Sequence, residues 1–451
     1  MTHAAGLWTR RRVIKAGVAL PLAGCAGRSA SPPRNLEFWT LSLKPFESYI
    51  RRTIAQFEAE HPGVEVEWVD VPFEAIERKL VAATAAGRSP DVVNMSDLTF
   101  ARFASLGAFA DHDALLTRPA DETYLPGALN VCRIGGALRA LPWYLTTQSV
   151  LANRDVLERA GLTSGDVPTR WADLLATAHR TRLGGGSFLF SHPLGRESQL
   201  PAMLLADGIE LFRLDSEGRL TATLATPEVS AMLSGWIDAF GAGVVPRESA
   251  TKGHAHLVEG FQSGRLGIIN TGPNFLGRIR DVAPSVFDAT DVRPAITGSL
   301  GRSHISVMVL GVMARSKNAR LAAQFASHVT GASAQLEFCR VVNILPSTPA
   351  SLDDPLFDPP SAAGGAEAKI AMARASAAAA LPHAVAFTPA LAAWPDMRKA
   401  FEDQITRVLL GTSDLDAALV NVERLWNRHL AATGGGPLDA IPTPAPLGAR
   451  A

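Results

Sequence analysis

The side chains of this chain that could bind a metal ion or act as nucleophiles are few and scattered. His254, His256 and Glu259 have the types and close spacing of three metal ligands. Their neighbours favour a polar turn that leads into a helix, so we predict no metal site. The sequence holds no G-x-x-x-x-G-K-[ST] phosphate loop, H-E-x-x-H zinc pair or G-x-S-x-G nucleophile turn. No local pattern selects a carboxylate pair for acid–base chemistry. We therefore predict no catalytic residue and no cofactor.

The three cysteines suggest one covalent modification and leave one pairing open. Cys25 follows the small residues Ala23 and Gly24, and the short apolar run before them follows Arg10–Arg12. This segment resembles a twin-arginine lipoprotein signal, which is too short to span a bilayer of ~30 Å. Cleavage would make Cys25 the lipidated N-terminus. Cys132 and Cys339 could form a disulfide outside the cytoplasm or remain two buried thiols.

Composition excludes several classes of protein. The 451 residues hold 43 Lys and Arg, 43 Asp and Glu, and 47% apolar residues. General disorder is excluded by this apolar content, and a broad basic face for nucleic acid is excluded by the lack of basic excess. Four of the basic residues lie within residues 1–25, so the mature chain carries four net negative charges. No later stretch reaches the ~18 apolar residues of a membrane span.

The elements that must position any site alternate between strands and helices. Residues 36–40, 64–68 and 90–95 have the composition of strands, and apolar residues at helical spacing lie between them. Strands joined through helices pair in parallel, so we predict an α/β lobe. Near the end, an apolar stripe from Leu415 to Leu425 predicts a helix capped by Thr412 or Ser413.

A series of short motifs then carries a family resemblance. The chain resembles extracellular solute-binding protein family 1, the maltose-binding-protein-like substrate-binding lipoproteins of carbohydrate ABC importers. Each motif is weak alone, whereas their order and spacing across residues 36–430 are specific; Ala152 stands where the family usually has tyrosine. The motifs are F-E-A-E-H-P-G-V-E-V at 57–66, A-G-R-S-P-D-V-V at 86–93, A-L-P-W-Y at 140–144, L-A-N-R-D-V-L at 151–157, A-G-L at 160–162, P-T-R-W at 168–171, F-Q-S-G-R at 261–265 and G-P at 272–273.

The resemblance implies an α/β protein with the two-lobed periplasmic binding protein type II fold. A ligand cleft would lie between lobes joined by crossing segments, and lobe closure would bury a sugar for delivery to the permease subunits and ATPase of an ABC importer. No bond is made or broken, so the resemblance implies no enzyme. We expect a monomer with no nucleic-acid partner, held outside the cytoplasmic membrane by its lipid anchor.

The resemblance also implies which residues hold the ligand, because sugar sites combine flat aromatic rings with polar groups that bind hydroxyls. Trp39 has the alternative of a core position, and Asp97 the alternative of capping a helix. Asn274 stands where several family members place an aromatic ring, and here the ring comes one residue later as Phe275. The expected ligand-binding residues are Trp39, Thr40, Asn94, Ser96, Asp97, Trp143, Tyr144, Gly272, Asn274, Phe275, Trp394 and Arg398.

We also predict how the chain is divided into segments. A signal at 1–25 and a tether at 26–35 precede lobe 1 (36–147 and 295–350) and lobe 2 (148–294 and 351–432), and a disordered tail covers 433–451.

Two other functions remain open. A glycerol-phosphate ligand is the nearest rival to a sugar, with Arg398 and Arg302 or His304 as its cationic clamp. A lipid-anchored carbohydrate-active hydrolase is the rival from another class.

Overall fold

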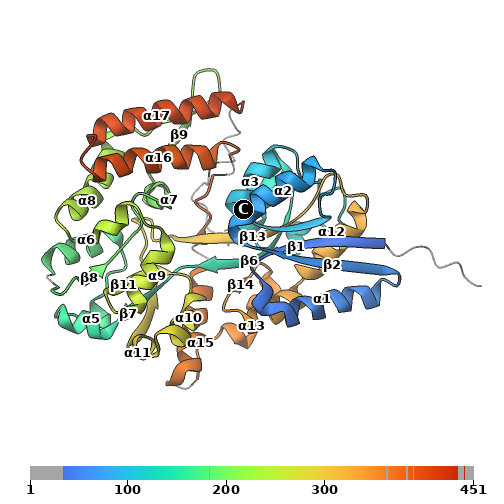
Figure 1. Ribbon diagram of the computed structural model, residues 1–451, viewed down its shortest axis with the longest axis horizontal. Helices are drawn as coiled ribbons and strands as arrows, with labels where there is room; N and C mark the ends of the chain where they lie inside the picture. The colour runs from blue at the N-terminus through green and yellow to red at the C-terminus, as the bar shows by residue number, and fades with distance from the viewer. Residues whose placement is uncertain are drawn as a thin grey trace, which may run out of the picture.

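The computed structural model describes residues 34–181, 183–361, 364–381, 384–389, 391–434 and 441. Within these ranges the chain forms two α/β lobes that lie side by side, each built around its own β-sheet (Figure 1). The predicted α/β fold with two lobes is confirmed. The predicted signal, Cys25 and nearly all of the tether lie outside the described residues, as does most of the predicted tail.

The first lobe is built on a seven-stranded sheet with the order β14-β6-β13-β3-β1-β2, in which β15 also pairs with β13. Its first three strands are the three predicted from the sequence, and β1 pairs in parallel with both β2 and β3. The antiparallel strand β13 then joins β3 to β6. The strands are β1 (Arg34–Leu41), β2 (Val64–Val71), β3 (Val92–Ser96), β6 (Leu141–Thr147), β13 (Ser303–Val312), β14 (Leu345–Pro346) and β15 (Ala384–Val385).

Helices pack on this sheet through one apolar face each, and a separate hairpin lies beside them. In α1, for example, Tyr49, Ile50, Ile54 and Phe57 are buried at helical spacing, as the sequence predicts. The helices are α1 (Glu47–Glu60), α2 (Ile76–Ala85), α3 (Asp97–Ser105), α4 (Pro126–Cys132), α12 (Ala319–Val329), α13 (Ala332–Val341) and α14 (Pro349–Leu352), and the hairpin pairs β4 (Arg133–Ile134) with β5 (Ala137–Leu138).

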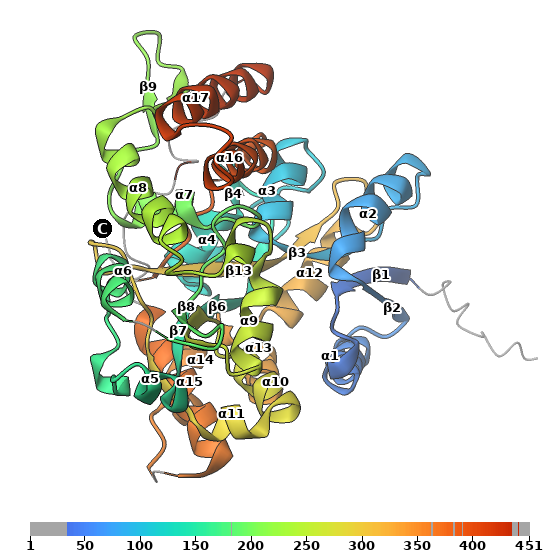
Figure 2. The same ribbon diagram turned by 60° about the vertical axis from the view of Figure 1, so that its left-hand side comes forward.

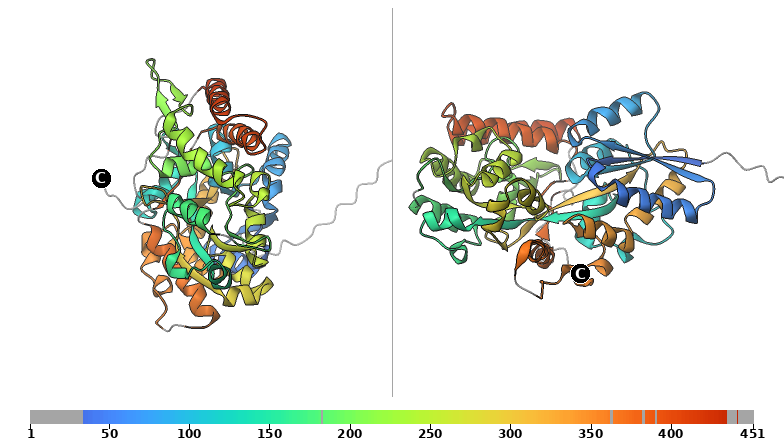
Figure 3. Two further views of the ribbon diagram at one scale, coloured as in Figure 1. Left: turned by 90° about the vertical axis from the view of Figure 1, so that its left-hand side faces the viewer. Right: turned by 60° about the horizontal axis from the view of Figure 1, so that its bottom comes forward.

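The second lobe has a four-stranded sheet with the order β12-β7-β11-β8. Its strands are β7 (Ser149–Asn153), β8 (Phe188–Phe190), β11 (Leu266–Thr271) and β12 (Thr290–Pro294), with a separate hairpin of β9 (Phe212–Leu214) and β10 (Leu220–Ala222). Its helices are α5 (Arg154–Arg159), α6 (Trp171–Arg180), α7 (Leu200–Ala206), α8 (Pro227–Gly241), α9 (His254–Gln262), α10 (Phe275–Val282), α11 (Pro284–Asp288), α16 (Trp394–Leu409) and α17 (Leu415–Ala432). Figure 3 shows α16 and α17 in red along one side of this lobe.

Three segments of chain cross between the lobes. Gln148 separates β6 from β7, residues 295–302 connect β12 to β13, and the segment after β15 leads into α16. Residues of the predicted second-lobe segment 351–432 contribute to both lobes, because Phe357 and Leu381 belong to the apolar core of the first. The exact lobe boundaries stay a prediction.

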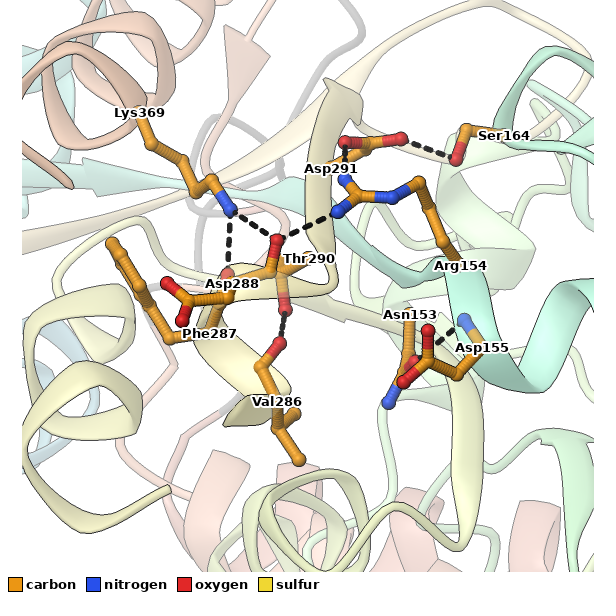
Figure 4. Close-up of polar contacts among 10 residues, drawn as sticks. All are labelled: Asn153, Arg154, Asp155, Ser164, Val286, Phe287, Asp288, Thr290, Asp291 and Lys369. Atoms are coloured by element: carbon orange, nitrogen blue, oxygen red, sulfur yellow. Dashed lines mark hydrogen bonds and ion pairs between the residues drawn. The ribbon is translucent and has the colours of Figure 1, made fainter. Parts of the chain in front are cut away.

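Helix α15 (Gly365–Ala380) contacts both lobes. Near its start, Lys369 Nζ donates hydrogen bonds to the carbonyl oxygens of Phe287 (2.6 Å) and Asp288 (3.0 Å), which end α11 in the second lobe (Figure 4). Near its other end, the Ala377 carbonyl accepts a hydrogen bond from Thr147 Oγ1 (3.2 Å), at the end of β6. Helix α15 therefore ties the two lobes together beside the first crossing segment.

The last helix starts later than the predicted cap. Helix α17 is present with the predicted apolar stripe, and Leu419, Val422 and Trp426 are buried. Its N-cap is Asp414, whose carboxylate accepts the backbone N–H groups of Asp416 and Ala417. The prediction of Thr412 or Ser413 is wrong because the carboxylate of Asp414 satisfies the free N–H groups of the first turn.

Candidate functional site

The lobes touch each other beyond the ends of strands, away from the crossing segments. Helix α3, which follows β3 in the first lobe, contacts α16 of the second, and Leu98 packs against the core of the second lobe (Figure 2). Asn343, after α13 in the first lobe, donates a hydrogen bond from Nδ2 to the carbonyl of Pro273 (3.0 Å), which follows β11. Open α/β sheets bind ligands beyond the carboxyl ends of their strands, so these contacts frame the candidate site.

Asp97 is the buried carboxylate of the first lobe at this interface. Only 7% of its surface is exposed, and its Oδ1 accepts the Leu98 N–H (2.8 Å). Its Oδ2 has no hydrogen-bond partner within the described residues. Burial raises the pKa of Asp97 to about 6, although nearby backbone N–H groups and Arg398 on the other lobe favour its charged form. The N-cap of α3 is its neighbour Ser96, whose Oγ accepts the Thr99 N–H (3.4 Å).

Helix α16 supplies charged groups from the second lobe. Arg398 Nε lies 3.6 Å from Glu402 Oε1, one turn further along the helix. Burial raises the pKa of Glu402, which Arg398 and the backbone N–H groups of Glu197 and Ser198 oppose. In the part of the chain that the structure describes, Glu402 Oε1 accepts no hydrogen bond. Ionisable side chains from both lobes thus lie near each other at the interface: Asp97 from the first lobe, and Arg398 and Glu402 from the second.

A second cluster of polar and aromatic contacts in the second lobe is built around His254, the first residue of α9. Its backbone N–H donates to Glu197 Oε2 (2.9 Å), and its Nε2 lies 3.0 Å from Oγ1 of Thr271, which ends β11. The Phe275 ring packs edge-on against the imidazole, with ring centroids 5.1 Å apart. Burial lowers the pKa of His254, so the imidazole is neutral near pH 7.

The three expected tryptophans lie in apolar cores rather than at the lobe interface. Trp143 is fully buried and stacks on Phe338 at 5.3 Å, and Trp394 packs edge-on against Trp426 at 5.4 Å. Trp39 is buried in the first-lobe core. Their burial does not support a role in direct ligand contact. Each ring is buried because it lies on the face of its strand or helix that packs against the core.

Two polar candidates of the first lobe have their hydrogen bonds inside that lobe. Thr40 Oγ1 donates to Asp70 Oδ1 and accepts from Trp68 Nε1, both at 2.7 Å. Asn94 is fully buried and donates from Nδ2 to the Val309 carbonyl (3.1 Å). Both side chains therefore bond to the first-lobe sheet and its edge, while Asn94 Oδ1 has no partner among the described residues.

Other candidates keep some exposed surface. Tyr144 follows Trp143 on β6 and is only partly buried, and its ring packs edge-on against Phe338 at 5.3 Å. Asn274 is exposed and Phe275 partly buried. A Cβ on Gly272 would lie 2.3 Å from Asn274 Oδ1, so glycine leaves the space that this turn requires.

Residues of the rival phosphate clamp lie around a small cavity at the crossing segments. Arg302 and His304 line it together with Gln148, Trp171 and Phe387. Its volume is about 20 Å³, which suits a single water molecule. Gln148 also accepts a hydrogen bond from Asn270 Nδ2 (2.7 Å), so the cavity is part of a polar network at the hinge.

Sequence reasoning missed Asn343 and Glu402 at the interface, and the contacts of Glu197 and His254 within the second lobe. An acidic residue four positions after Arg398, the spacing of one helical turn, was a usable signal for Glu402. Glu197 and Asn343 lie in loops with no motif, and only the fold shows their contacts.

The groups considered for metal binding or disulfide formation have other structural roles. No cluster of three or more His, Cys, Asp or Glu residues within the described ranges could hold a metal ion. His256 pairs with Glu259 instead, at 3.5 Å. Cys132 and Cys339 are buried and free, and burial raises the pKa of each thiol, to about 12 for Cys339. None of the described helices has both the length and the apolar character of a membrane span.

Comparisons with known proteins identify the family. Residues 42–336 match the bacterial extracellular solute-binding proteins. The chain belongs to this family. A protein of Synechococcus sp. MITs9220, provisionally named an oligosaccharide periplasmic-binding protein, is 33% identical with a TM-score of 0.80, over 88% of this chain and 99% of that one. The GacH receptor of Streptomyces glaucescens, crystallised unliganded and with acarbose, shares the fold at 23% identity and TM-score 0.70, with 88% and 99% covered.

A sequence relative is the uncharacterized lipoprotein in the oleD 5′ region of Streptomyces antibioticus, 26% identical over 70% of this chain and 71% of its own length. This chain is thus a bacterial extracellular solute-binding protein. Its family and structural neighbours are binding proteins rather than enzymes, as the sequence predicts.

Proposed function

We propose that this protein captures a neutral sugar, a mono- or oligosaccharide or a glycoside such as glucosylglycerol, by lobe closure and delivers it to an ABC permease. The ligand would lie among Asp97, Tyr144 and Asn343 of the first lobe and Pro273, Asn274, Phe275, Arg398 and Glu402 of the second. No cofactor is needed, because binding and release change no covalent bond.

The observation that carries this proposal is a set of hydrogen-bond acceptors at the lobe interface that accept no hydrogen bond. Asp97 Oδ2, Asn343 Oδ1 and Glu402 Oε1 are buried without hydrogen-bond partners among the described residues, although Glu402 Oε1 forms an ion pair with Arg398. Buried polar atoms are normally hydrogen-bonded, because leaving one without a partner costs ~1–3 kcal/mol. A sugar carries many O–H donors and could supply the hydrogen bonds that these acceptors lack.

The same groups favour a neutral sugar over glycerol phosphate. A phosphate needs donors and positive charge, whereas Arg398 has the Glu402 carboxylate beside it at 3.6 Å. Arg302 and His304 line a cavity of about 20 Å³, too small for a phosphate group. The Asp97 carboxylate opposite Arg398 would also repel an anion.

Calorimetry and thermal shift on residues 26–451, which lack the lipidated cysteine, test this proposal. We expect saturable binding and a raised Tm with at least one neutral saccharide or glucosylglycerol-like solute, and none with glycerol 3-phosphate. Tighter binding of the phosphate would overturn the choice of ligand class. Release of sugar product, followed by chromatography, would instead support the hydrolase.

We also propose that the chain reaches its site of action through the twin-arginine route and is held there by a lipid on Cys25. This proposal is supported by the order of twin arginines, apolar run and small residues before the cysteine. Replacing Arg10 and Arg11 by lysine should leave the precursor inside the cell. Cys25→Ser should be exported but should not label with radioactive palmitate. Normal export of the lysine variant, or labelling of the serine variant, would contradict the respective step.

A further inference from the structure

Glu197 stands out because its backbone has a conformation that side chains disfavour. Its φ is +55°, in the left-handed region where a Cβ crowds the backbone. It lies in the loop between β8 and α7, residues 191–199, which contacts two other elements of the second lobe. Such strain persists only where surrounding contacts hold the residue in place.

One set of contacts joins Glu197 to helix α9. Its Oε2 accepts the His254 N–H at 2.9 Å, so this carboxylate caps the first turn of a neighbouring helix. A Cβ on Gly253 would lie 2.2 Å from that carboxylate, so the glycine before the helix leaves the space that Glu197 occupies. His254 in turn contacts Thr271, two residues before the Pro273 carbonyl that receives Asn343 of the first lobe.

A second set of contacts joins the same loop to helix α16. The backbone N–H groups of Glu197 and Ser198 face the Glu402 carboxylate. Glu402 lies one turn after Arg398, on the helix that contacts α3 of the first lobe. Nearby, a Cβ on Gly195 would lie 2.5 Å from Thr406 Oγ1, also on α16. The loop therefore contacts α9 and α16, and each of these leads to a contact with the first lobe.

We propose that Glu197 is a positioning residue: its carboxylate holds His254 and α9 in place, and through Thr271 and Pro273 it sets the second-lobe surface that closes on the ligand. Glu197 does not itself contact the ligand. This inference rests on the proposed sugar-binding function, and it assigns a role to a residue outside the ligand contacts.

Three variants distinguish this positioning role from a role in the stability of the loop alone. Glu197→Gly relieves the left-handed strain and removes the carboxylate, so we expect an unchanged or higher Tm together with at least tenfold weaker sugar binding. Glu197→Gln keeps an oxygen that can accept the His254 N–H, and we expect affinity within about threefold of wild type. Glu259→Gln, which changes an exposed carboxylate on α9, is the control and should change neither quantity.

The pKa of His254 tests the role of Glu197 without any ligand. The negative charge of Glu197 favours protonated His254, so Glu197→Gln should lower the His254 pKa measured by NMR with labelled histidine, while Glu259→Gln should leave it unchanged. An unchanged His254 pKa in Glu197→Gln would overturn the proposal. Wild-type affinity in Glu197→Gly would do the same, as would equal loss of affinity in the Gln and Gly variants, which indicates direct ligand contact. Absence of sugar binding by wild type, with the His254 shift present, would reject the sugar function alone.

Discussion

Adjacent aromatic residues of one strand differ in burial in this protein. Trp143 is fully buried and stacks on Phe338, whereas Tyr144 packs edge-on against the same Phe338 ring at 5.3 Å and remains partly exposed. Of the two aromatic rings that the motif presents, Tyr144 is therefore the one with surface that a ligand can reach.

The Trp143 and Tyr144 pair yields the first prediction. Trp143→Ala should lower the free energy of unfolding by about 3–5 kcal/mol, because it empties a fully buried site. Tyr144→Ala should weaken sugar binding about tenfold or more with a much smaller loss of stability. Urea unfolding and calorimetry measure the two quantities. A stable Trp143→Ala protein with weakened binding would instead place the indole in the cleft.

Asp97 yields a prediction about pH. Burial raises its pKa from 3.8 to about 6, so the folded state holds this proton more tightly than the unfolded state. Its contribution to stability is therefore present below about pH 4 and is lost as the pH rises through about 6, by on the order of 3 kcal/mol. Urea unfolding at pH 4.5 and 7.5 should show this loss in wild type and a smaller one in Asp97→Asn. Equal pH dependence in both proteins would contradict the burial of this carboxylate.

Among the helices and strands, the parallel strands of the first lobe follow from local sequence, whereas the position of α15 depends on contacts with residues far away in the sequence. Its apolar face consists mainly of alanines, such as Ala373 and Ala377. Small side chains allow the helix to pack closely on both lobes, and polar contacts at its two ends fix its position. Figure 4 shows the end in the second lobe, where Arg154 also donates to the Asp288 carbonyl (2.7 Å) and pairs with Asp291.

Lys369 is the residue that tests this role of α15. Lys369→Met keeps the length of the side chain and removes both hydrogen bonds to the end of α11, so we expect a loss of about 1–2 kcal/mol of stability. Lys399→Met is a matched control, since Lys399 pairs with exposed Asp403 on its own helix and its loss should have no measurable effect. Equal urea midpoints for the two variants would show that the contact of Lys369 contributes nothing.

At the scale of the whole molecule, the two lobes form separate cores joined by three crossings, α15 and the interface contacts. Separate cores allow each lobe to move as a rigid body, and closure is then governed by the groups that meet between them. Asn343 is one such group in the absence of ligand, through its 3.0 Å hydrogen bond to Pro273.

Loss of that contact should shift the free protein toward an open form. We expect Asn343→Ala to have a larger radius of gyration without ligand than wild type, and saturating ligand should reduce the radius in both proteins. Small-angle scattering measures this difference, and Tm should change little because Asn343 lies outside both cores. Identical radii for the two free proteins would show that the contact does not hold the lobes together.

The amino-acid sequence alone was enough to predict the α/β class, the order of the first strands and helices, and the family. These features depend on short-range patterns of apolar residues, turns and charges, which are visible locally. The export segment and the ligand-binding roles of Asp97 and Arg398 stay predictions. The burial of Trp143, Trp394 and Thr40 was decided only by the tertiary structure, because the face that a side chain presents depends on what packs against it. The same holds for Glu197 and Glu402, which are far apart in sequence and meet only because the second lobe folds, and for Asn343, which reaches Pro273 only where the two lobes meet.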